Sequence, residues 1–406
     1  MNRLRALGGI VLVLALSCGR RTASRPVEVT FWQTWPVEAI APLVKRYEAE
    51  YPGVHVVVSR LPAEGATDTL ELAAQSGRPP DLVELSPAQT AEFIDEGLLS
   101  DWSAGVADLK PDVRGWELCS LGDAIYGLPW LLRTRVLLYN RELLARAREL
   151  STRAPSTWDE LKTAAAHVQK LGAGVHGIGL PDSPHERYAS FMTFAWGIGG
   201  DLLSARLDSC RIDSPENAAA LAFLVSLEPA SLFAGSDSIA REFERGRLGL
   251  WIADAGFAVE ARRRDPRLPL GVALVPQAAT DRGERATLGS GSVLASFTRS
   301  RRKEDALRFA RYLGERQNTL ALAAALETVF PPYPDVAEAP EYRARPEAQL
   351  CIRQLQTAHF EPLLRDRDAM LAVVDSLVGE ALAHRLTPRA TVGLADSLIR
   401  KLGVTR

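Results

Sequence analysis

The stretch after residue 26 alternates β-forming and helical segments, and this alternation limits the folds open to the chain. Residues 27–32 and 54–59 are rich in β-branched and aromatic side chains and are predicted strands, and 81–85 is a third, shorter one. Residues 39–51, 67–76 and 88–96 carry apolar side chains at helical spacing and stop before Gly or Pro. Strands and helices in this order predict βαβ units and a largely parallel sheet.

The rest of the chain continues as a mixture of both elements. Residues 124–130 are interrupted by Gly and Pro, and we expect them to lead into a separate strand. Further strands are predicted at 136–139, 176–180, 248–252, 270–275 and 292–297. Helices are predicted at 157–171, 188–196, 215–227, 239–245, 302–313 and 318–326, with 347–402 mostly helical. The pattern indicates an α/β fold with a helical C-terminal part and two lobes.

The first 18 residues have the pattern of an export signal. Arg3 and Arg5 precede the uncharged stretch 6–17, which is shorter than the roughly 20 apolar residues of a membrane span and is typical of a secretory signal. It ends in Ala-Leu-Ser-Cys, which resembles a bacterial lipobox. Residues 1–18 are therefore predicted to be a lipoprotein signal peptide with lipidation at Cys18, and ordinary cleavage near Ser17 is the alternative. Residues 19–26 are small, polar and basic, as in a flexible tether.

Composition excludes several classes of function. The formal net charge is −2 and the isoelectric point is near 6.4, so a nucleic-acid partner is not expected. The cysteines are far apart and none begins a Cys-x-x-Cys motif, so no metal site or cofactor is predicted. Cys119, Cys210 and Cys351 can form at most one disulfide, and three separate buried thiols are an equal alternative.

Several segments, in order, resemble the maltose-binding-protein-like group of bacterial ABC-transporter solute-binding proteins. The resemblance extends from about residue 27 to residue 403. The segments that carry it are 29–35 (VTFWQTW), 47–56 (YEAEYPGVHV), 80–84 (PDLVE), 93–99 (FIDEGLL), 126–130 (YGLPW), 138–144 (LYNRELL), 155–161 (PSTWDEL) and 243–252 (FERGRLGLWI). Each segment alone is a weak signal, but together behind a lipobox they identify the chain as a member of this group.

The resemblance implies a periplasmic-binding-protein-like fold, in which two α/β lobes are joined by a hinge with a ligand cleft between them. One lobe would comprise residues 27–131 plus 288–335 and the other 136–285 plus 340–406. It also implies a monomeric binder, not an enzyme. The protein would be exported and held at the cell envelope by its N-terminal lipid, and would deliver a sugar or oligosaccharide to the membrane permease of an ABC importer.

Candidate ligand residues come from two sources. In open α/β sheets, ligands lie beyond the carboxyl ends of strands, and sugar sites combine aromatic with planar polar groups. This rule selects Gln33, Trp35, Glu84, Ser86, Gln89, Asp254 and Phe257. The resemblance adds Trp130 and Arg133 at the hinge, Tyr188, Phe191 and Trp196 as an aromatic wall, and Ser290 in a loop facing the cleft. Packing or solvent exposure without a ligand role is the alternative for each.

Two other functions stay open. A secreted glycan-active enzyme requires two carboxylates facing one cleft, and Glu84 with Asp254 is the pair that the strand-end rule offers. The same fold could instead bind a polyamine, a phosphate ester, iron or thiamine. The Gly-Ser-Gly-Ser segment 289–292 is a weak candidate for anion binding. The segment 85–88 (LSPA) lacks the acidic residue expected of a sugar cleft, so the fold is better supported than the sugar.

Overall fold

The computed structural model describes residues 25–62, 65–147, 153–183, 185–280, 283–364 and 366–403. The predicted export signal and most of the predicted tether lie outside these residues. The main sheet has ten strands in the order β2-β1-β3-β11-β6-β9-β7-β8, with β10 paired to β6 and β12 to β11. Its strands are β1 (Val27–Gln33), β2 (Val54–Arg60), β3 (Leu82–Leu85), β6 (Leu128–Asn140), β7 (His176–Pro181), β8 (Ser231–Ala234), β9 (Leu248–Asp254), β10 (Leu270–Ala273), β11 (Thr287–Ala295) and β12 (Ala358–Phe360).

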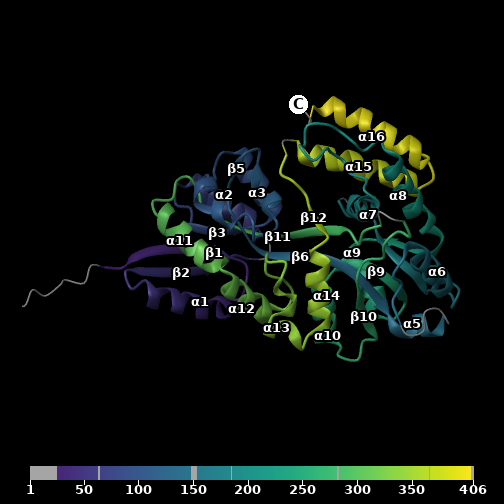
Figure 1. Cartoon of the computed structure of the whole chain (residues 1–406), viewed down its shortest axis with the longest axis horizontal. Coiled ribbons are helices and arrows are strands. Elements are labelled where there is room, and N and C mark those ends of the chain that lie inside the picture. Colours follow the sequence, from purple (N-terminus) through teal and green to yellow (C-terminus); the bar gives the residue numbers. More distant parts are fainter. Residues whose placement is uncertain are drawn as a thin grey trace, which may run out of the picture.

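Helices surround both halves of this sheet, so the fold is the expected two-lobe α/β type (Figure 1). A small β4–β5 hairpin (Ser120–Leu121 and Ala124–Ile125) adjoins one lobe. The longer helices are α1 (Val37–Glu50), α2 (Ala66–Gln75), α3 (Pro87–Asp95), α5 (Arg141–Arg146), α6 (Trp158–Gln169), α7 (Glu186–Trp196), α8 (Pro215–Ser226), α9 (Ser236–Glu244), α10 (Gly256–Arg264), α11 (Lys303–Gly314), α12 (Arg316–Leu326), α14 (Pro346–Leu355), α15 (Arg367–Leu382) and α16 (Pro388–Leu402).

The first half forms as its sequence predicts. β1 pairs in parallel with β2 and with β3, and α1 between β1 and β2 buries Ile40, Leu43 and Tyr47 against the sheet. At the carboxyl end of β3, Ser86 and Gln89 form a capping box that starts α3: the Ser86 hydroxyl accepts from the Gln89 amide, and the Gln89 side chain accepts from the Ser86 amide. This cap fixes the position of Ser86 directly after the carboxyl end of β3.

Two antiparallel strands, β6 and β11, run across the middle of the molecule, and β6 belongs to both halves of the sheet (Figure 1). The first part of β6 pairs with β11, and its second part pairs with β9 and β10. The continuous strand β6 therefore joins the lobes. The predicted lobe boundaries at 131–136 and 285–288 fall on or beside these strands, and the one at 335–340 lies between α12 and α14. All three remain predictions.

The expectation of a turn-rich segment at 124–130 followed by a separate strand is wrong, because β6 already begins at Leu128. Pro129 lacks an amide donor, and the strand accommodates it at a register shift where Trp130 is the extra residue opposite Ser292 and Val293. Segment 289–292, expected as a loop, lies within β11. A Cβ on Gly291 would be 2.6 Å from the Leu131 carbonyl oxygen, so glycine allows the two strands to approach.

The apolar core forms clusters, and the first of them extends into both lobes. It joins the β1–β3 half to the hinge strands and to α9, β9 and β10, and a second cluster lies beneath α7, α8, α15 and α16. A smaller cluster around Phe93 and Phe297 covers the other face of the first lobe. Within the ranges that the structure describes, no helix is long and apolar enough to cross a membrane.

Candidate functional site

A cavity of about 450 Å³ lies at the carboxyl ends of the strands, between the two lobes. The start of α3 contributes Ser86 from one lobe, and the end of β9 contributes Asp254 from the other. The central strands β6 and β11 contribute Arg133 and Ser290 to the same cavity. Four of the residues predicted from the sequence are therefore brought together by four different elements.

Arg133 occupies a central position among them. Its guanidinium lies 5.7 Å from the centre of the Trp35 ring, in a cation–π contact, and its Nη1 lies 3.7 Å from Oδ1 of Asp254. Both members of the Arg133–Asp254 pair have side chains 41% exposed, so each keeps polar atoms available to a bound molecule. The same Oδ1 accepts a hydrogen bond from the Gly256 amide at 2.8 Å, which holds the carboxylate at the start of α10.

Trp35 is held behind Arg133 by Glu84. The indole Nε1 donates to Oε1 of Glu84 at 2.7 Å, and the Thr34 amide and hydroxyl both donate to Oε2 at 2.9 Å. Glu84 is 4% exposed, and this burial raises the pKa of its carboxyl group despite the donors around it. Gln33 is buried, and its side-chain oxygen accepts from the Trp35 amide. Gln33, Trp35 and Glu84 thus support the cavity wall from behind.

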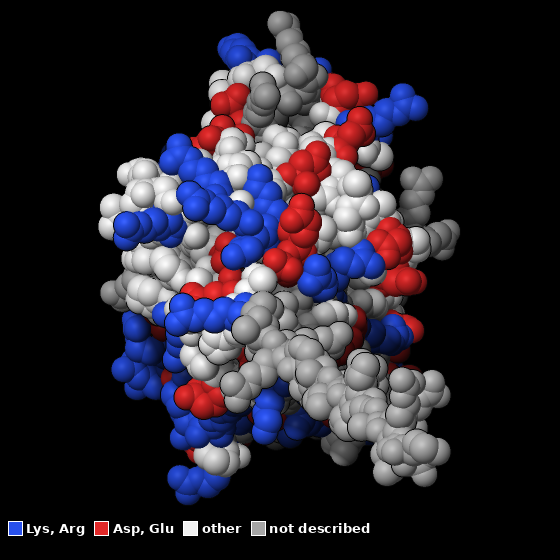
Figure 2. Space-filling model, turned by 90° about the vertical axis from the view of Figure 1, so that its left-hand side faces the viewer, with Lys and Arg blue, Asp and Glu red and all other residues white. Residues whose placement is uncertain are grey.

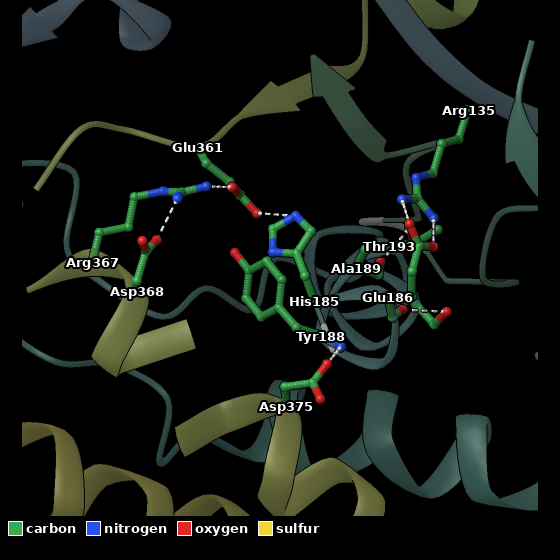
Figure 3. Close-up of polar contacts among 11 residues, drawn as sticks. Arg135, His185, Glu186, Tyr188, Ala189, Thr193, Glu361, Arg367, Asp368 and Asp375 are labelled. Carbon is green, nitrogen blue, oxygen red and sulfur yellow. Dashed lines mark hydrogen bonds and ion pairs between the residues drawn. The ribbon is translucent and has the colours of Figure 1, made fainter. Parts of the chain in front are cut away.

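A second ion pair ties the hinge to α7. Arg135 on β6 and Glu186 in the first turn of α7 make two parallel hydrogen bonds of 2.7 and 2.8 Å (Figure 3). Burial alone would raise the pKa of Glu186, but the hydrogen bonds and charge of Arg135 hold it below its usual value. Both residues line the cavity, and neither was predicted as a site residue.

A third charged group closes one end of the cavity. His185 precedes α7 with a left-handed φ of 69°, and its Nε2 lies 3.5 Å from Oε1 of Glu361 (Figure 3). The other carboxylate oxygen of Glu361 contacts Arg367, which also bonds Asp368 at 2.8 Å. Residue 361 comes directly after β12, a strand too short to be recognised in the sequence.

A second cavity, of about 230 Å³, adjoins the first and has a more aromatic lining. Glu361 and Arg367 line both cavities, so they stand between them. Trp196 stacks on His359 with ring centres 4.7 Å apart and planes 6° apart, and Tyr188 lines the same space. The predicted aromatic residues Tyr188 and Trp196 therefore face this second cavity and not the first.

Other predicted residues lie away from both cavities. Trp130 is fully buried in the core, with its ring edge-on to Phe31 at 6.0 Å, because the irregular pairing of β6 turns it inward. Phe191 is buried on the inner face of α7, and Phe257 packs against Trp251. Gln89 serves the α3 cap and donates to Thr67 at 3.0 Å. No ligand role is assigned to these four by their positions.

Asp254 has a raised pKa, mainly because the surrounding protein desolvates its carboxyl group, although Arg133 opposes the shift. The side chain still reaches solvent through the cavity. Among the described residues, no three His, Cys, Asp or Glu side chains gather in an arrangement able to hold a metal ion. Polar atoms in the two cavities therefore offer hydrogen bonding, while the apolar side chains of the second cavity, such as Leu202 and Met370, offer apolar surface.

The missed residues could have been found by applying the strand-end rule consistently. His185 and Glu186 follow β7, at the carboxyl end of a parallel strand, just as Trp35, Ser86 and Phe257 follow β1, β3 and β9. Arg135 lies two positions beyond Arg133 on β6, so both point to the same side of the strand. Glu361 and Arg367 carry no such signal.

Comparison with known proteins agrees with this architecture. The family described as bacterial extracellular solute-binding protein matches residues 42–349. A relative named as a binding protein in Brucella abortus strain 2308 is 23% identical, over 88% of this chain and 89% of its own length. The maltooligosaccharide ABC transporter solute-binding lipoprotein of Streptococcus pneumoniae strain R6 is 26% identical, over 44% of this chain and 43% of its own.

Solved structures extend the likeness to nearly the whole chain. The cyclic alpha-maltosyl-1,6-maltose binding protein from Arthrobacter globiformis has a TM-score of 0.81 and 25% identity, covering 92% of this chain and 97% of its own. A Mycobacterium tuberculosis protein solved with glycerophosphocholine has a TM-score of 0.73 and 20% identity, covering 93% and 98%. The same fold therefore carries different ligands in different proteins.

Proposed function

The chain belongs to the bacterial extracellular solute-binding protein family, and we propose that it binds an oligosaccharide between its lobes and delivers it to the permease of an ABC importer. The sugar-binding relatives and structural neighbours support a carbohydrate as the ligand. Binding without turnover is the chemistry proposed for the cleft. Ser86 and Asp254 come from opposite lobes, so a ligand that contacts both binds the closed form more tightly than the open form. This difference in affinity stabilises the closed form.

The charge balance of the main cavity is the observation that carries this proposal. Three arginines line it, and each has a carboxylate partner: Arg133 with Asp254, Arg135 with Glu186, and Arg367 with Glu361. Such a cavity presents many donors and acceptors but little net charge, which matches the hydroxyl groups of a neutral sugar. The adjoining cavity is lined by apolar side chains, among them Leu202, Phe360 and Met370, which supply the apolar surface that sugar C–H groups require.

The adjoining cavities also bear on ligand length. Glu361 and Arg367 line both, so a ligand in the charged cavity can continue towards the aromatic one. This continuity supports a ligand of at least two rings. A phosphate ester is the second candidate, because the fold also carries glycerophosphocholine in the Mycobacterium protein. The carboxylate partner of each arginine argues against a free phosphate and favours the sugar.

A calorimetric titration tests the proposal. Malto-oligosaccharides, other glycans, glycerophosphodiesters and polyamines would be titrated into the protein, with product analysis to detect turnover. We expect a glycan to bind without product and Arg133→Gln to weaken it at least tenfold. Arg141→Gln is the matched control, since Arg141 lies just beyond the end of β6 and outside both cavities. Binding of a phosphodiester alone, or equal affinity in both variants, would contradict the proposal.

Lipid anchoring at Cys18 forms part of the same proposal. The lipobox-like end of the signal supports it, and the Streptococcus relative is named a lipoprotein. Growth of the bacterium with labelled palmitate tests it directly. The wild-type protein should carry the label and fractionate with membranes, while Cys18→Ser should lose both properties. An unlabelled wild-type protein of the same size would point to ordinary cleavage near Ser17.

A further inference from the structure

Five exposed cationic side chains gather at one edge of the first lobe. Arg299, Arg301, Arg302 and Lys303 follow β11, and Arg78 lies in the loop after α2. Arg299 donates to the Ala74 carbonyl at the end of α2, which brings both segments together. We call these five residues the basic edge. Figure 2 looks onto this end and shows Lys and Arg side chains gathered on it, with Asp and Glu beside them.

The basic edge lies where the chain enters the fold. Asp81 receives hydrogen bonds from the amide and hydroxyl of Thr30 on β1, and from the Ser300 hydroxyl at 2.7 Å. Asp81 is thus a bridge between the first strand and the segment 299–303. Because β1 begins at Val27, three residues before Thr30, the basic edge and the start of the described fold share one side of the lobe (Figure 1).

The charges of the basic edge lack ion-pair partners among the described residues, unlike those of many arginines in the molecule. Elsewhere, many arginines pair with Asp or Glu, as in Arg308–Asp305 and Arg311–Asp108. Within the described residues, none of the five makes an ion pair. Glu304 is the exposed acid that follows them directly. The whole chain has a net charge of −2, so this local excess is not a general property of the surface.

The tether limits what this edge can face. Nine positions separate Cys18 from Val27, a span of at most about 30 Å when fully extended. The inference rests here on the proposed lipid anchor, because that anchor places the start of β1 close to the bilayer. The segment 19–26 adds three more arginines, Arg20, Arg21 and Arg25. Cations within a Debye length of an anionic membrane surface are attracted to it.

We propose that the basic edge rests on the anionic phospholipid headgroups of the membrane that holds the anchor. The lipid anchor alone sets only a maximum distance between the first lobe and the membrane. The contact of the basic edge also fixes which side of the lobe faces the bilayer. The cleft lies at the opposite ends of β1 and β3 from this edge, so it stays clear of the lipid. Each Lys or Arg contributes roughly a fivefold gain in affinity near such a surface.

Vesicle binding by the unlipidated chain 19–406 tests this contact, since the described fold begins at residue 25. Sedimentation with vesicles of phosphatidylglycerol and phosphatidylcholine would be compared with phosphatidylcholine alone, at low and high salt. We expect binding only to the anionic vesicles and loss at high salt. The triple variant Arg301→Gln/Arg302→Gln/Lys303→Gln should bind roughly a hundredfold more weakly. None of these three side chains makes a hydrogen bond or ion pair within the described residues, so the fold should persist.

A matched control carries the same change in net charge at another surface, Arg245→Gln/Arg247→Gln/Arg267→Gln, and should bind as the wild type does. A dye on Thr298→Cys should shift its emission on anionic vesicles, and the same dye on Asp237→Cys should not. An equal loss of vesicle binding in both triple variants would overturn the proposal. Full binding by the Arg301→Gln/Arg302→Gln/Lys303→Gln variant would also overturn it, and would assign the binding to Arg20, Arg21 and Arg25. Sugar titration of the same samples measures ligand binding separately. Failure of the membrane contact can therefore be distinguished from failure of the proposed sugar binding.

Discussion

Arg135 and Glu186 form a two-point ion pair that joins the central strand β6 to the first turn of α7. Nη1 lies 2.7 Å from Oε2, and Nη2 lies 2.8 Å from Oε1. The side chains are only 16% and 26% exposed, so water screens the pair weakly. The contact therefore fixes the beginning of α7, and with it His185 and Glu186, against the hinge.

Breaking this pair should destabilise the protein measurably. Arg135→Gln would leave the Glu186 carboxylate without its partner, at a cost of about 2–3 kcal/mol in the free energy of unfolding. Urea denaturation monitored by circular dichroism gives this value. Arg385→Gln is the control, because Arg385 is exposed and its partner Glu380 is only half-buried, and it should change stability little. Equal destabilisation by the two variants would contradict the prediction.

The same pair predicts a pH dependence. The pKa of Glu186 is lower in the folded protein than its ordinary value of 4.5, so its ionisation stabilises the fold above that value. This stabilisation is lost as the pH falls through the lower folded pKa. The stability difference between wild type and Glu186→Gln should therefore be full at pH 6 and shrink below pH 4.5. A difference that stayed constant down to pH 3 would be evidence against the assignment.

Asp254 should govern ligand affinity more than stability. It is 41% exposed in the cavity, and its contact with Arg133 is long, so Asp254→Asn should change the melting temperature little while weakening ligand binding at least tenfold. Because burial raises its pKa above 3.8, ligand affinity should begin to fall at a higher pH than for an ordinary Asp. Titrations from pH 7 to pH 4 measure this fall, and Asp254→Asn should abolish it.

Glu84 should have the reverse profile, with a large effect on stability. Glu84→Ala leaves the amide and hydroxyl of Thr34 and the Trp35 indole without their acceptor, which should cost about 2–4 kcal/mol. Trp35→Phe removes a single hydrogen-bond donor to Glu84. It should therefore lower the free energy of unfolding by only about 1 kcal/mol, less than Glu84→Ala does. Chemical denaturation of both variants provides the comparison. A smaller loss for Glu84→Ala than for Trp35→Phe would refute the supporting role of Glu84.

The thiols should be inert in the native protein. Cys119, Cys210 and Cys351 are buried and free of disulfides, and burial raises the pKa of each, to about 11 for Cys210. A thiol-specific reagent should therefore label the chain 19–406 slowly until denaturant is added, and then label all three. Fast labelling of the native protein, or fewer than three sites after unfolding without reductant, would contradict this state.

The strands and helices of the first lobe could be predicted from local sequence patterns. Each of these elements buries one face, and the spacing of its apolar residues identifies that face. β6 could not, since Pro129 normally interrupts a strand and only the irregular pairing with β11 accommodates it. β12 has three residues and forms only where β11 supplies a partner. The missed elements are those whose hydrogen-bond partners lie far away in the sequence.

The site divides in the same way. Ser86, Arg133, Asp254 and Ser290 lie on elements that the sequence places at the cleft, and the structure brings them together. The family resemblance places Trp130 there as well, but the irregular pairing of β6 with β11 turns it into the core. Glu361 and Arg367 could not be predicted, because a short strand and the start of α15 bring them there.

The position of β11 also governs when the protein can fold. It lies between β3 and β6 in the sheet, although it follows them by more than 140 residues in the chain. β3 and β6 cannot be joined through β11 until the chain has been synthesised as far as residue 295. That residue lies more than two-thirds of the way along the sequence. Contacts this distant in sequence make folding slow. A nascent chain therefore stays incomplete and extensible for most of its synthesis, which is the state that passage through a secretion channel requires.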